Sequence, residues 1–381
     1  MGKVNMEELL NCALCPNICR CECPVLQVTG HEAVAPAGKA RLAAMLQKEQ
    51  LGWDEEVLGA VSHCLSCRGC TIYCPFAELS LCDELINTRT AAKGSGVRLP
   101  QVEPYLANLK SYGSPYGQKN ETAARGDKDA EIIYFAGCTS LANNPASVEA
   151  ACSLFNKAGL PYQMIEEDCC GYPAKIWGDE ELARQLAAEN LRKMEESGAS
   201  TMVTNCPECW LSFTGYYPEW GMELPLEIID APTFFLGLIN EGRLKPGQAN
   251  IEQVSYHDPC IWARAAGKTA EPREILGSIP GLELLEANSY GEKTRCCGGG
   301  AMFQLSYPDT ADAIAKRRLG EFPDGMAIVT ACPFCREGLL QEDRQVLELV
   351  ELIDRTCQTS TLQKPKSVEK VSDTFSTYFG I

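Results

Sequence analysis

Five cysteines recur in the same order in two halves of the chain. In each half, one cysteine is followed after about thirty to thirty-five residues by an adjacent pair, and after a similar distance by a Cys-x-x-Cys pair. The first set is Cys138, Cys169, Cys170, Cys206 and Cys209, and the second is Cys260, Cys296, Cys297, Cys332 and Cys335. The repeat predicts two related structural units, each of which gathers five thiols.

The cysteine content and the charge restrict the class of protein. The chain has 381 residues and 22 cysteines, which is too long for a secreted disulfide scaffold and favours metal-bound thiolates in a reducing compartment. Residues 1–8 lack the apolar core of a secretory signal, and no apolar run is long enough to span a membrane. A net charge of −17 argues against nucleic acid and anionic lipid as partners, and allows docking onto a basic protein.

Two further groups of cysteines lie near the N-terminus. Cys64-x2-Cys67-x2-Cys70-x3-Cys74-Pro75 is the spacing of bacterial ferredoxins, in which three thiolates of a tight loop bind one [4Fe–4S] cubane and the fourth binds another. The earlier group consists of Cys12, Cys15, Cys19 and Cys23-Pro24, with one extra residue before Cys19 and with Cys21 between the last two. The two groups predict a pair of cubanes.

We assign the ligands of the two cubanes on the rule that the fourth cysteine of each group binds the cubane of the other group. One cubane takes Cys12, Cys15, Cys19 and Cys74, and the other takes Cys64, Cys67, Cys70 and Cys23. Cys21 is an alternative to Cys19 as the third ligand of the first cubane. A zinc site is the alternative for each group, although zinc sites pair their cysteines differently.

Short apolar segments precede four of the repeated cysteines. Strands are expected at 131–136, 201–204, 253–256 and 326–330, with a helix at 146–158, and this alternation favours α/β units with cysteines at the carboxyl ends of strands. The segment before residue 98 reads as helical, notably at 38–48 and 53–62. We expect domains at 1–98, 130–245 and 246–357, a linker or covering segment at 99–129, and a tail at 358–381.

The motifs resemble those of a known family. Cys169-Cys170-Gly171 and Cys296-Cys297-Gly298, each followed by Cys-x-x-Cys, are similar to the CCG domain, and the Cys-Pro pairs at 23 and 74 are similar to α-helical ferredoxin domains. The whole chain resembles the D subunit of heterodisulfide reductase, a fusion like its C and B subunits. It is also similar to the iron–sulfur subunits of anaerobic glycerol-3-phosphate dehydrogenase and glycolate oxidase. The resemblance implies a mixed α+β and α/β fold, with an α-helical ferredoxin domain before two pseudo-repeated α/β CCG domains.

The resemblance also implies that each set of five cysteines holds a noncubane [4Fe–4S] cluster. Gly171, Gly298 and Gly299 would let the backbone approach these clusters without an intervening side chain. His257 lies three residues before Cys260 and is a candidate proton donor, with a hydrogen-bonding role beside the cluster as the alternative. The alternative for each Cys-x-x-Cys pair is a zinc site or a redox dithiol.

Two functions fit these patterns. In the first, the chain is the electron-transfer subunit of a larger oxidoreductase and connects a flavoprotein partner with the CCG clusters, because it has no flavin or nicotinamide motif of its own. A membrane cytochrome or a quinone-reactive subunit is a further candidate partner. In the second, a disulfide is cleaved to two thiols at the paired noncubane clusters. A zinc-stabilised scaffold is the non-redox alternative. We expect a cytoplasmic protein that reaches a membrane only through a partner.

Overall fold

The N-terminal region is helical. The computed structural model describes residues 4–76, 79–120, 125–340 and 344–357, and the tail predicted at 358–381 lies outside them. The helices are α1 (Met6–Leu14), α2 (Pro24–Thr29), α3 (Pro36–Gln47), α4 (Glu55–Ser62) and α5 (Leu81–Ser95), with 3-10 turns η1 (Ile18–Glu22), η2 (Glu32–Val34) and η3 (Gly69–Thr71). The helices expected at 38–48 and 53–62 are therefore confirmed as α3 and α4.

The stretch at 99–129, expected as a linker or covering segment, contains helix α6 (Glu103–Tyr112). Tyr105 and Leu109 of α6 are buried in the same apolar cluster as residues of the N-terminal region and of both repeats. Ser306 Oγ lies 3.2 Å from the hydroxyl of Tyr105. This part of the stretch covers the body of the protein.

The first repeat forms a parallel three-stranded sheet in the order β1-β2-β3. Its elements are β1 (Ile132–Phe135), α7 (Cys138–Asn143), α8 (Pro145–Lys157), α9 (Tyr172–Ile176), α10 (Glu180–Ser197), β2 (Thr201–Thr204), α11 (Pro207–Leu211), the π-helical turn η4 (Ser212–Tyr216), α12 (Tyr217–Glu219), β3 (Glu227–Asp230) and α13 (Ala231–Asn240).

The second repeat forms a parallel four-stranded sheet in the order β5-β4-β6-β7. Its elements are β4 (Gln253–His257), α14 (Cys260–Arg264), α15 (Ala270–Gly277), β5 (Glu283–Leu284), η5 (Gly291–Lys293), η6 (Gly300–Met302), α16 (Phe303–Ser306), α17 (Pro308–Leu319), β6 (Ala327–Thr330), α18 (Pro333–Leu339), β7 (Val346–Glu348) and α19 (Leu349–Thr356). The four expected strands correspond to β1, β2, β4 and β6, which confirms a mixed α/β fold with parallel sheets.

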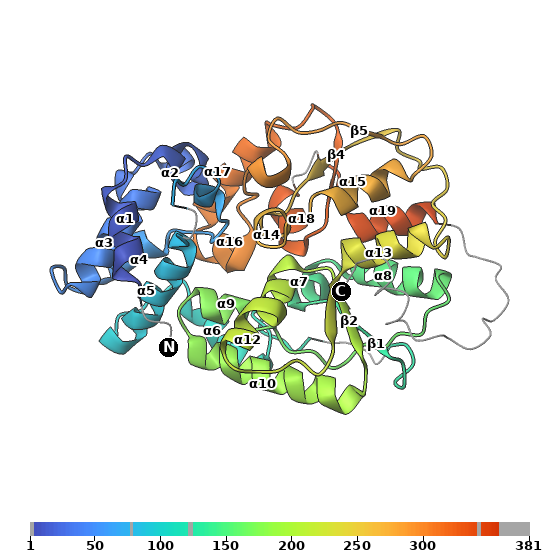
Figure 1. The fold of residues 1–381 in the computed structure, drawn as a ribbon, viewed down its shortest axis with the longest axis horizontal. Helices are drawn as coiled ribbons and strands as arrows, with labels where there is room; N and C mark the ends of the chain where they lie inside the picture. Colours follow the sequence, from blue (N-terminus) through green and yellow to red (C-terminus); the bar gives the residue numbers. More distant parts are fainter. Residues whose placement is uncertain (1–3, 77–78, 121–124, 341–343, 358–381) are drawn as a thin grey trace.

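The two repeats join through helices on one side of each sheet. Helix α8 packs against α19, and α13 packs against α15, so each pair takes one helix from each repeat (Figure 1). Lys157 and Asp354 form an ion pair of 2.8 Å across the α8–α19 contact. A second apolar cluster, which includes Phe155, Phe234 and Trp262, fills the space between these helices and the sheets.

The N-terminal helices dock against both repeats. Helix α2 lies beside α17 (Figure 1). The His63 ring stacks on Tyr307 with a centroid distance of 4.1 Å, and its Nε2 lies 3.1 Å from Thr310 Oγ1. Helix α5 also contacts α9 of the first repeat. All three regions therefore share one extended core.

Candidate iron–sulfur centres

The first group of N-terminal thiols surrounds one small cavity. Cys12, Cys15, Cys19 and Cys74 line it together with Asn17, Ile18, Tyr73, Pro75 and Phe76. Burial, reinforced by the neighbouring thiols, raises the pKa of Cys12 to about 12 and that of Cys19 to about 11. A metal that bound here would have to displace these protons, as thiolate-bound metals do.

Cys21 lies apart from this group. Its side chain is exposed, and its Sγ lies 3.6 Å from the carbonyl oxygen of Ile18 within the same 3-10 turn. Cys19, two positions earlier, faces the cavity. Asn17 begins the turn with a positive φ of 63°, a conformation that Asn tolerates better than most residues. Of the two alternatives for a third ligand, the structure brings Cys19 to the other three thiols.

The second group of N-terminal thiols surrounds another small cavity. The thiols that line it include those of Cys23, Cys64, Cys67 and Cys70. Cys23 therefore lies with the cysteines of the later loop, whereas Cys19 lines the other cavity. Lys39, which is 2% exposed, and Arg68 line the same cavity. These cations would offset the negative charge of a cluster bound by four thiolates.

The loop that carries Cys64, Cys67 and Cys70 has an unusual backbone. Ser66 and Arg68 have positive φ angles of 52° and 57°. Backbones that alternate between right- and left-handed conformations turn successive N–H groups toward one centre and bind anions. Each N-terminal cavity is lined by its four assigned thiols, and the second is lined by Cys82 as well, so both fit a [4Fe–4S] cubane by their donor chemistry.

The first set of five repeated cysteines is buried at one edge of the first sheet. Cys138 follows β1 and Cys206 follows β2, and the register that pairs Phe135 with Thr204 brings the two strand ends together. Cys169 interacts with Cys138 and Cys170, and Cys170 in turn interacts with Cys209. The expected placement of cysteines at the carboxyl ends of parallel strands explains why these thiols meet.

The second set of five repeated cysteines has the same arrangement. Cys297 Sγ and Cys335 Sγ lie 3.3 Å apart, and Cys296 interacts with Cys260 and Cys297. The backbone N–H groups of Gly298 and Gly299 donate to the sulfurs of Cys296 and Cys297, each at 3.5 Å. Five converging thiols with backbone donors suit an anionic iron–sulfur centre.

Close packing also explains why glycine occupies the three candidate positions. Gly171 and Gly298 have φ angles of 88° and 89°, and a Cβ there would lie 2.9 Å from the Ala183 carbonyl oxygen and 2.6 Å from the Ala311 carbonyl oxygen. A Cβ on Gly299 would lie 2.5 Å from the carbonyl oxygen of Phe334. The nearest atoms thus belong to the protein backbone, so these glycines hold the loops against their neighbouring helices.

His257 is buried beside the second set. One atom from each of His257, Cys297 and Cys335 lies within 4.8 Å of the other two. Arg318 Nε donates to Nδ1 of His257 at 3.1 Å, which leaves Nε2 to carry the imidazole proton. Burial is the largest cause that lowers the pKa of His257, so the ring is neutral at pH 7. This geometry suits a hydrogen-bond donor to Cys297.

Sequence reasoning missed Glu208, which lies between the two sets of repeated cysteines. Its Oε1 accepts from the backbone N–H of Ala301 at 2.8 Å, which joins the first repeat to the second. Burial, followed by the nearby thiols of Cys170 and Cys260, raises the pKa of Glu208 far above its usual range. The only sequence signal was its position inside the motif Cys206-Pro207-Glu208-Cys209.

The four groups of thiols form a connected series. Cys23 bridges the two N-terminal groups, because it interacts with Cys19 and also with Cys64. Cys67 of the second cavity interacts with Cys296 of the second repeat, and Arg264 Nη1 donates to the carbonyl oxygen of Cys67 at 2.7 Å.

The series continues into the first repeat, because Cys332 and Cys206 are close enough to interact electrostatically. The second repeat therefore lies between the N-terminal region and the first repeat along this series.

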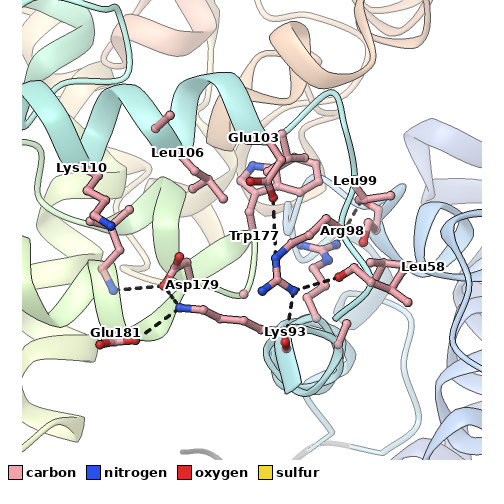
Figure 2. Close-up of a pocket in the computed structure, with 18 of the residues that line it drawn as sticks. Leu58, Lys93, Arg98, Leu99, Glu103, Leu106, Lys110, Trp177, Asp179 and Glu181 are labelled. Carbon is pink, nitrogen blue, oxygen red and sulfur yellow. Dashed lines mark hydrogen bonds and ion pairs between the residues drawn. The ribbon is translucent and has the colours of Figure 1, made fainter. Parts of the chain in front are cut away.

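A cavity of about 360 Å³ lies outside this series (Figure 2). Its walls come from α4, α5, α6 and the segment from α9 into α10, and they include Leu58, Leu106 and Trp177. Charged side chains at its mouth pair with one another, as Lys93 does with Asp179 at 2.6 Å. No cysteine lines this cavity.

Nine of the ten repeated cysteines are buried, and Cys260 is partly exposed.

Comparison with known proteins identifies the class. The model of a cysteine-rich domain, CCG, matches residues 132–214 and again residues 254–339, and the model of a 4Fe-4S dicluster domain matches residues 8–77. These matches together cover more than half of the chain. The chain therefore belongs to the iron–sulfur proteins in which a 4Fe-4S dicluster domain precedes paired CCG domains.

Among these proteins, the chain is similar to the D subunit of heterodisulfide reductase. It is 28% identical to the D subunit of the dihydromethanophenazine:CoB–CoM heterodisulfide reductase of Methanosarcina barkeri, over 94% of this chain and 96% of the relative. It is 28% identical to the B subunit of the fumarate reductase (CoM/CoB) of Methanothermobacter marburgensis, over 91% and 72%. It is 26% identical to the EtfAB:quinone oxidoreductase of Syntrophomonas wolfei, over 87% and 50%.

These relatives support an iron–sulfur oxidoreductase component. Within the described part of the chain, no helix has both the length and the apolar character to cross a membrane.

Proposed function

We propose that the chain is the iron–sulfur electron-transfer subunit of a multi-subunit oxidoreductase and that it carries electrons between a flavoprotein partner and the CCG centres. The observation that carries this proposal is the connected series of four thiol groups. Cys23 lies near enough to Cys19 and Cys64 to interact with them electrostatically, Cys67 interacts directly with Cys296, and Cys332 interacts electrostatically with Cys206, so each group has a neighbouring group. Such a series suits electron transfer because each centre has a neighbour on the path.

The proposal assigns two cubane and two noncubane [4Fe–4S] clusters, which supply one-electron chemistry when bound. Cys12, Cys15, Cys19 and Cys74 would hold the first cubane, and Cys23, Cys64, Cys67 and Cys70 the second. The two repeated sets of five would hold the noncubane clusters, with Gly171, Gly298 and Gly299 in the adjoining loops. His257 would donate a hydrogen bond, or a proton, beside Cys297.

The partners follow from what the sequence lacks and from its charge. A flavoprotein would supply the two-electron chemistry, because the chain has no flavin or nicotinamide motif. A net charge of −17 suits docking onto a basic face of that partner or of a membrane cytochrome or quinone-reactive subunit. Such docking would hold a cytoplasmic chain at the membrane without a span of its own.

Anaerobic purification with iron counting and EPR spectroscopy tests the proposal. About sixteen irons per chain are expected for four [4Fe–4S] clusters. A count of about eight or fewer, or zinc in place of iron, would overturn the four-cluster assignment. A chain with Cys335→Ser should lose iron, whereas Cys152→Ser should not, because Cys152 lies 3.8 Å from the sulfur of Met164, away from all four groups.

The second candidate function is reduction of a disulfide to two thiols, with two electrons and two protons taken up. Two complete sets of five cysteines and the similarity to the D subunit of heterodisulfide reductase over 94% of the chain favour it. The burial of nine of the ten repeated cysteines favours the electron-transfer role instead. A new radical-type EPR signal that appears only when a disulfide is added would support the second function over the first.

A further inference from the structure

The loop that follows the adjacent cysteines of the second set has a strained backbone. Ala301 and Met302, which come directly after the glycines at 298–300, have positive φ angles of 53° and 61°. Both residues are buried. Residues other than glycine avoid these angles, and they keep them only where the surrounding structure imposes them. The contacts of Ala301 therefore decide the conformation of this loop.

Two side chains of the first repeat hold Ala301 in place. Oε1 of Glu208, in α11, accepts from the backbone N–H of Ala301 at 2.8 Å. Nε1 of Trp177, at the end of α9, donates to the carbonyl oxygen of Ala301 at 2.6 Å. Both side chains are buried. The N–H and the carbonyl group of one strained residue in the second repeat thus both bond to the first repeat.

The glycines before Ala301 are packed between the Cys-x-x-Cys segments of both repeats. A Cβ on Gly300 would lie 3.0 Å from Oε1 of Glu208, and a Cβ on Gly299 would lie 2.5 Å from the carbonyl oxygen of Phe334. Glu208 and Phe334 occupy the same position in the two Cys-Pro-x-Cys motifs. Of the two side chains, only the carboxyl of Glu208 can accept a hydrogen bond from the loop.

The corresponding loop of the first set is held differently. Asn190 Nδ2 donates to the carbonyl oxygen of Cys169 at 3.2 Å, and the hydroxyl of Tyr217 donates to the carbonyl oxygen of Cys170 at 3.2 Å. Asn190 and Tyr217 belong to the first repeat, as do the two cysteines. The first loop is therefore supported by its own repeat, whereas the second loop is supported across the interface.

The supported loop carries the backbone donors of the second set. The N–H groups of Gly298 and Gly299 donate to the sulfurs of Cys296 and Cys297, each at 3.5 Å. Hydrogen bonds to the sulfurs of an iron–sulfur cluster stabilise its more negative, reduced state and so raise its reduction potential. A loop that relaxed at Ala301 would move these donors and weaken both bonds.

We propose that Glu208 and Trp177 are positioning residues of the second CCG centre: their hydrogen bonds to Ala301 hold the glycine loop in its strained conformation and so keep the reduction potential of that centre high. This inference rests on the proposed function, because it assumes that the second set of five cysteines holds an iron–sulfur cluster. The first repeat would thereby set the potential of the centre in the second repeat, although the second repeat supplies all five cysteines.

The test is an EPR-monitored redox titration of the full-length protein, purified without oxygen, with iron content measured for each variant. Cys335→Ser, which removes a thiol of the second set, identifies the signal of that centre. Trp177→Phe keeps an aromatic ring but removes the donor to Ala301, and Glu208→Ala removes the acceptor. Each should keep its iron and lower the potential of the second centre by about 59 mV, which corresponds to a tenfold shift in a one-electron equilibrium.

Three further variants separate positioning from other causes. Glu208→Gln keeps an acceptor oxygen and should retain most of the potential. Ala301→Gly, added to Glu208→Ala, should restore part of it, because glycine adopts a positive φ without support from its neighbours. Tyr217→Phe, the matched control, removes the bond to the carbonyl oxygen of Cys170 and should leave the potential of the second centre unchanged.

Several outcomes would overturn the inference. Unchanged potentials in Trp177→Phe and Glu208→Ala would leave the two bonds without a role at the centre. A raised potential in Glu208→Ala, with none in Trp177→Phe, would make the charge of the carboxyl the cause. Equal shifts in Glu208→Ala and Glu208→Gln would also exclude the bond to Ala301. Failure of the proposed function is separate, because it appears as low iron or as zinc in the unaltered protein.

Discussion

At the scale of single residues, two cysteines that are two positions apart differ in their surroundings: one lines a cavity and the other is exposed. Cys19 lines the first N-terminal cavity with a thiol whose pKa is raised to about 11 by burial and by neighbouring thiols. Cys21 is exposed and lies near the carbonyl oxygen of Ile18. A 3-10 turn has about three residues per turn, so side chains two apart cannot share a face.

This difference predicts unequal effects of the same substitution. Cys19→Ser should lower the iron content by about four per chain and remove one cubane EPR signal, because the first cavity would keep only three thiols. Cys21→Ser should leave both unchanged and serves as the matched control. Iron analysis and EPR of the reduced proteins check this, and the reverse pattern would assign the ligand to Cys21.

At the scale of elements, one buried carboxyl joins the starts of two helices from different repeats. Glu348 begins α19, and Glu351 Oε2 accepts from its backbone N–H at 2.7 Å in a capping box. Asn144, which begins α8, donates to Glu348 Oε1 at 2.7 Å. Burial raises the pKa of Glu348 to about 7.

This raised pKa predicts that stability depends on pH. The folded protein keeps the Glu348 proton between about pH 4.5 and 7 while the unfolded chain loses it, so unfolding becomes easier as the pH rises through this window. A difference of this size corresponds to about 3 kcal/mol, present below the window and lost above it. Thermal unfolding followed by circular dichroism at several pH values measures it.

Two variants test whether Glu348 causes the pH dependence of stability. Glu348→Gln keeps the acceptor oxygen for Asn144 but cannot ionise, so its melting temperature should vary less with pH across the window. Glu195→Gln removes an exposed carboxyl from α10 and should keep the pH dependence of the unaltered protein. Identical slopes for Glu348→Gln and the unaltered protein would contradict the assignment to Glu348.

At the scale of the whole molecule, Arg264 ties the N-terminal region to the second repeat. Its guanidinium donates to the carbonyl oxygen of Cys67 at 2.7 Å, and also to the carbonyl oxygens of Glu292 and Thr294. Cys67 and Cys296 meet beside it. Arg264 therefore holds the two groups of thiols together at the point where the series leaves the N-terminal region.

Loss of the hydrogen bonds of Arg264 should slow electron transfer without loss of iron. In Arg264→Gln, rapid-mixing experiments should show slower oxidation of the reduced cubanes by the CCG centres, because the two regions separate. Arg243→Gln removes a similar set of bonds, to the carbonyl oxygens of Ala158 and Gly159, away from this contact and should leave the rate unchanged. Equal rates in both variants would exclude Arg264 from this role.

The sequence predicted the elements that local patterns specify. The strands at 132–135, 201–204, 253–257 and 327–330 were predictable because each is a short buried run that ends before a cysteine. β3, β5 and β7 were not predicted. β5 and β7 have only two or three residues, which carry no periodic signal, and β3 has four residues of which the first is exposed. Cysteine spacing predicted which thiols line each N-terminal cavity, but it could not reveal Cys82 or Glu208, whose surroundings depend on contacts made by distant segments.

The docking of the N-terminal helices has a consequence for biosynthesis. Their neighbours in the second repeat, Arg264, Tyr307 and Thr310, come nearly two hundred or more positions later than Cys67, Gly59 and His63. The ribosome therefore releases the dicluster region long before its docking surface exists, and such distant contacts form slowly. Until then the loop from Cys64 to Cys70 lacks the cover of the second repeat, so a cluster proposed for this loop would be inserted more easily before docking than after it.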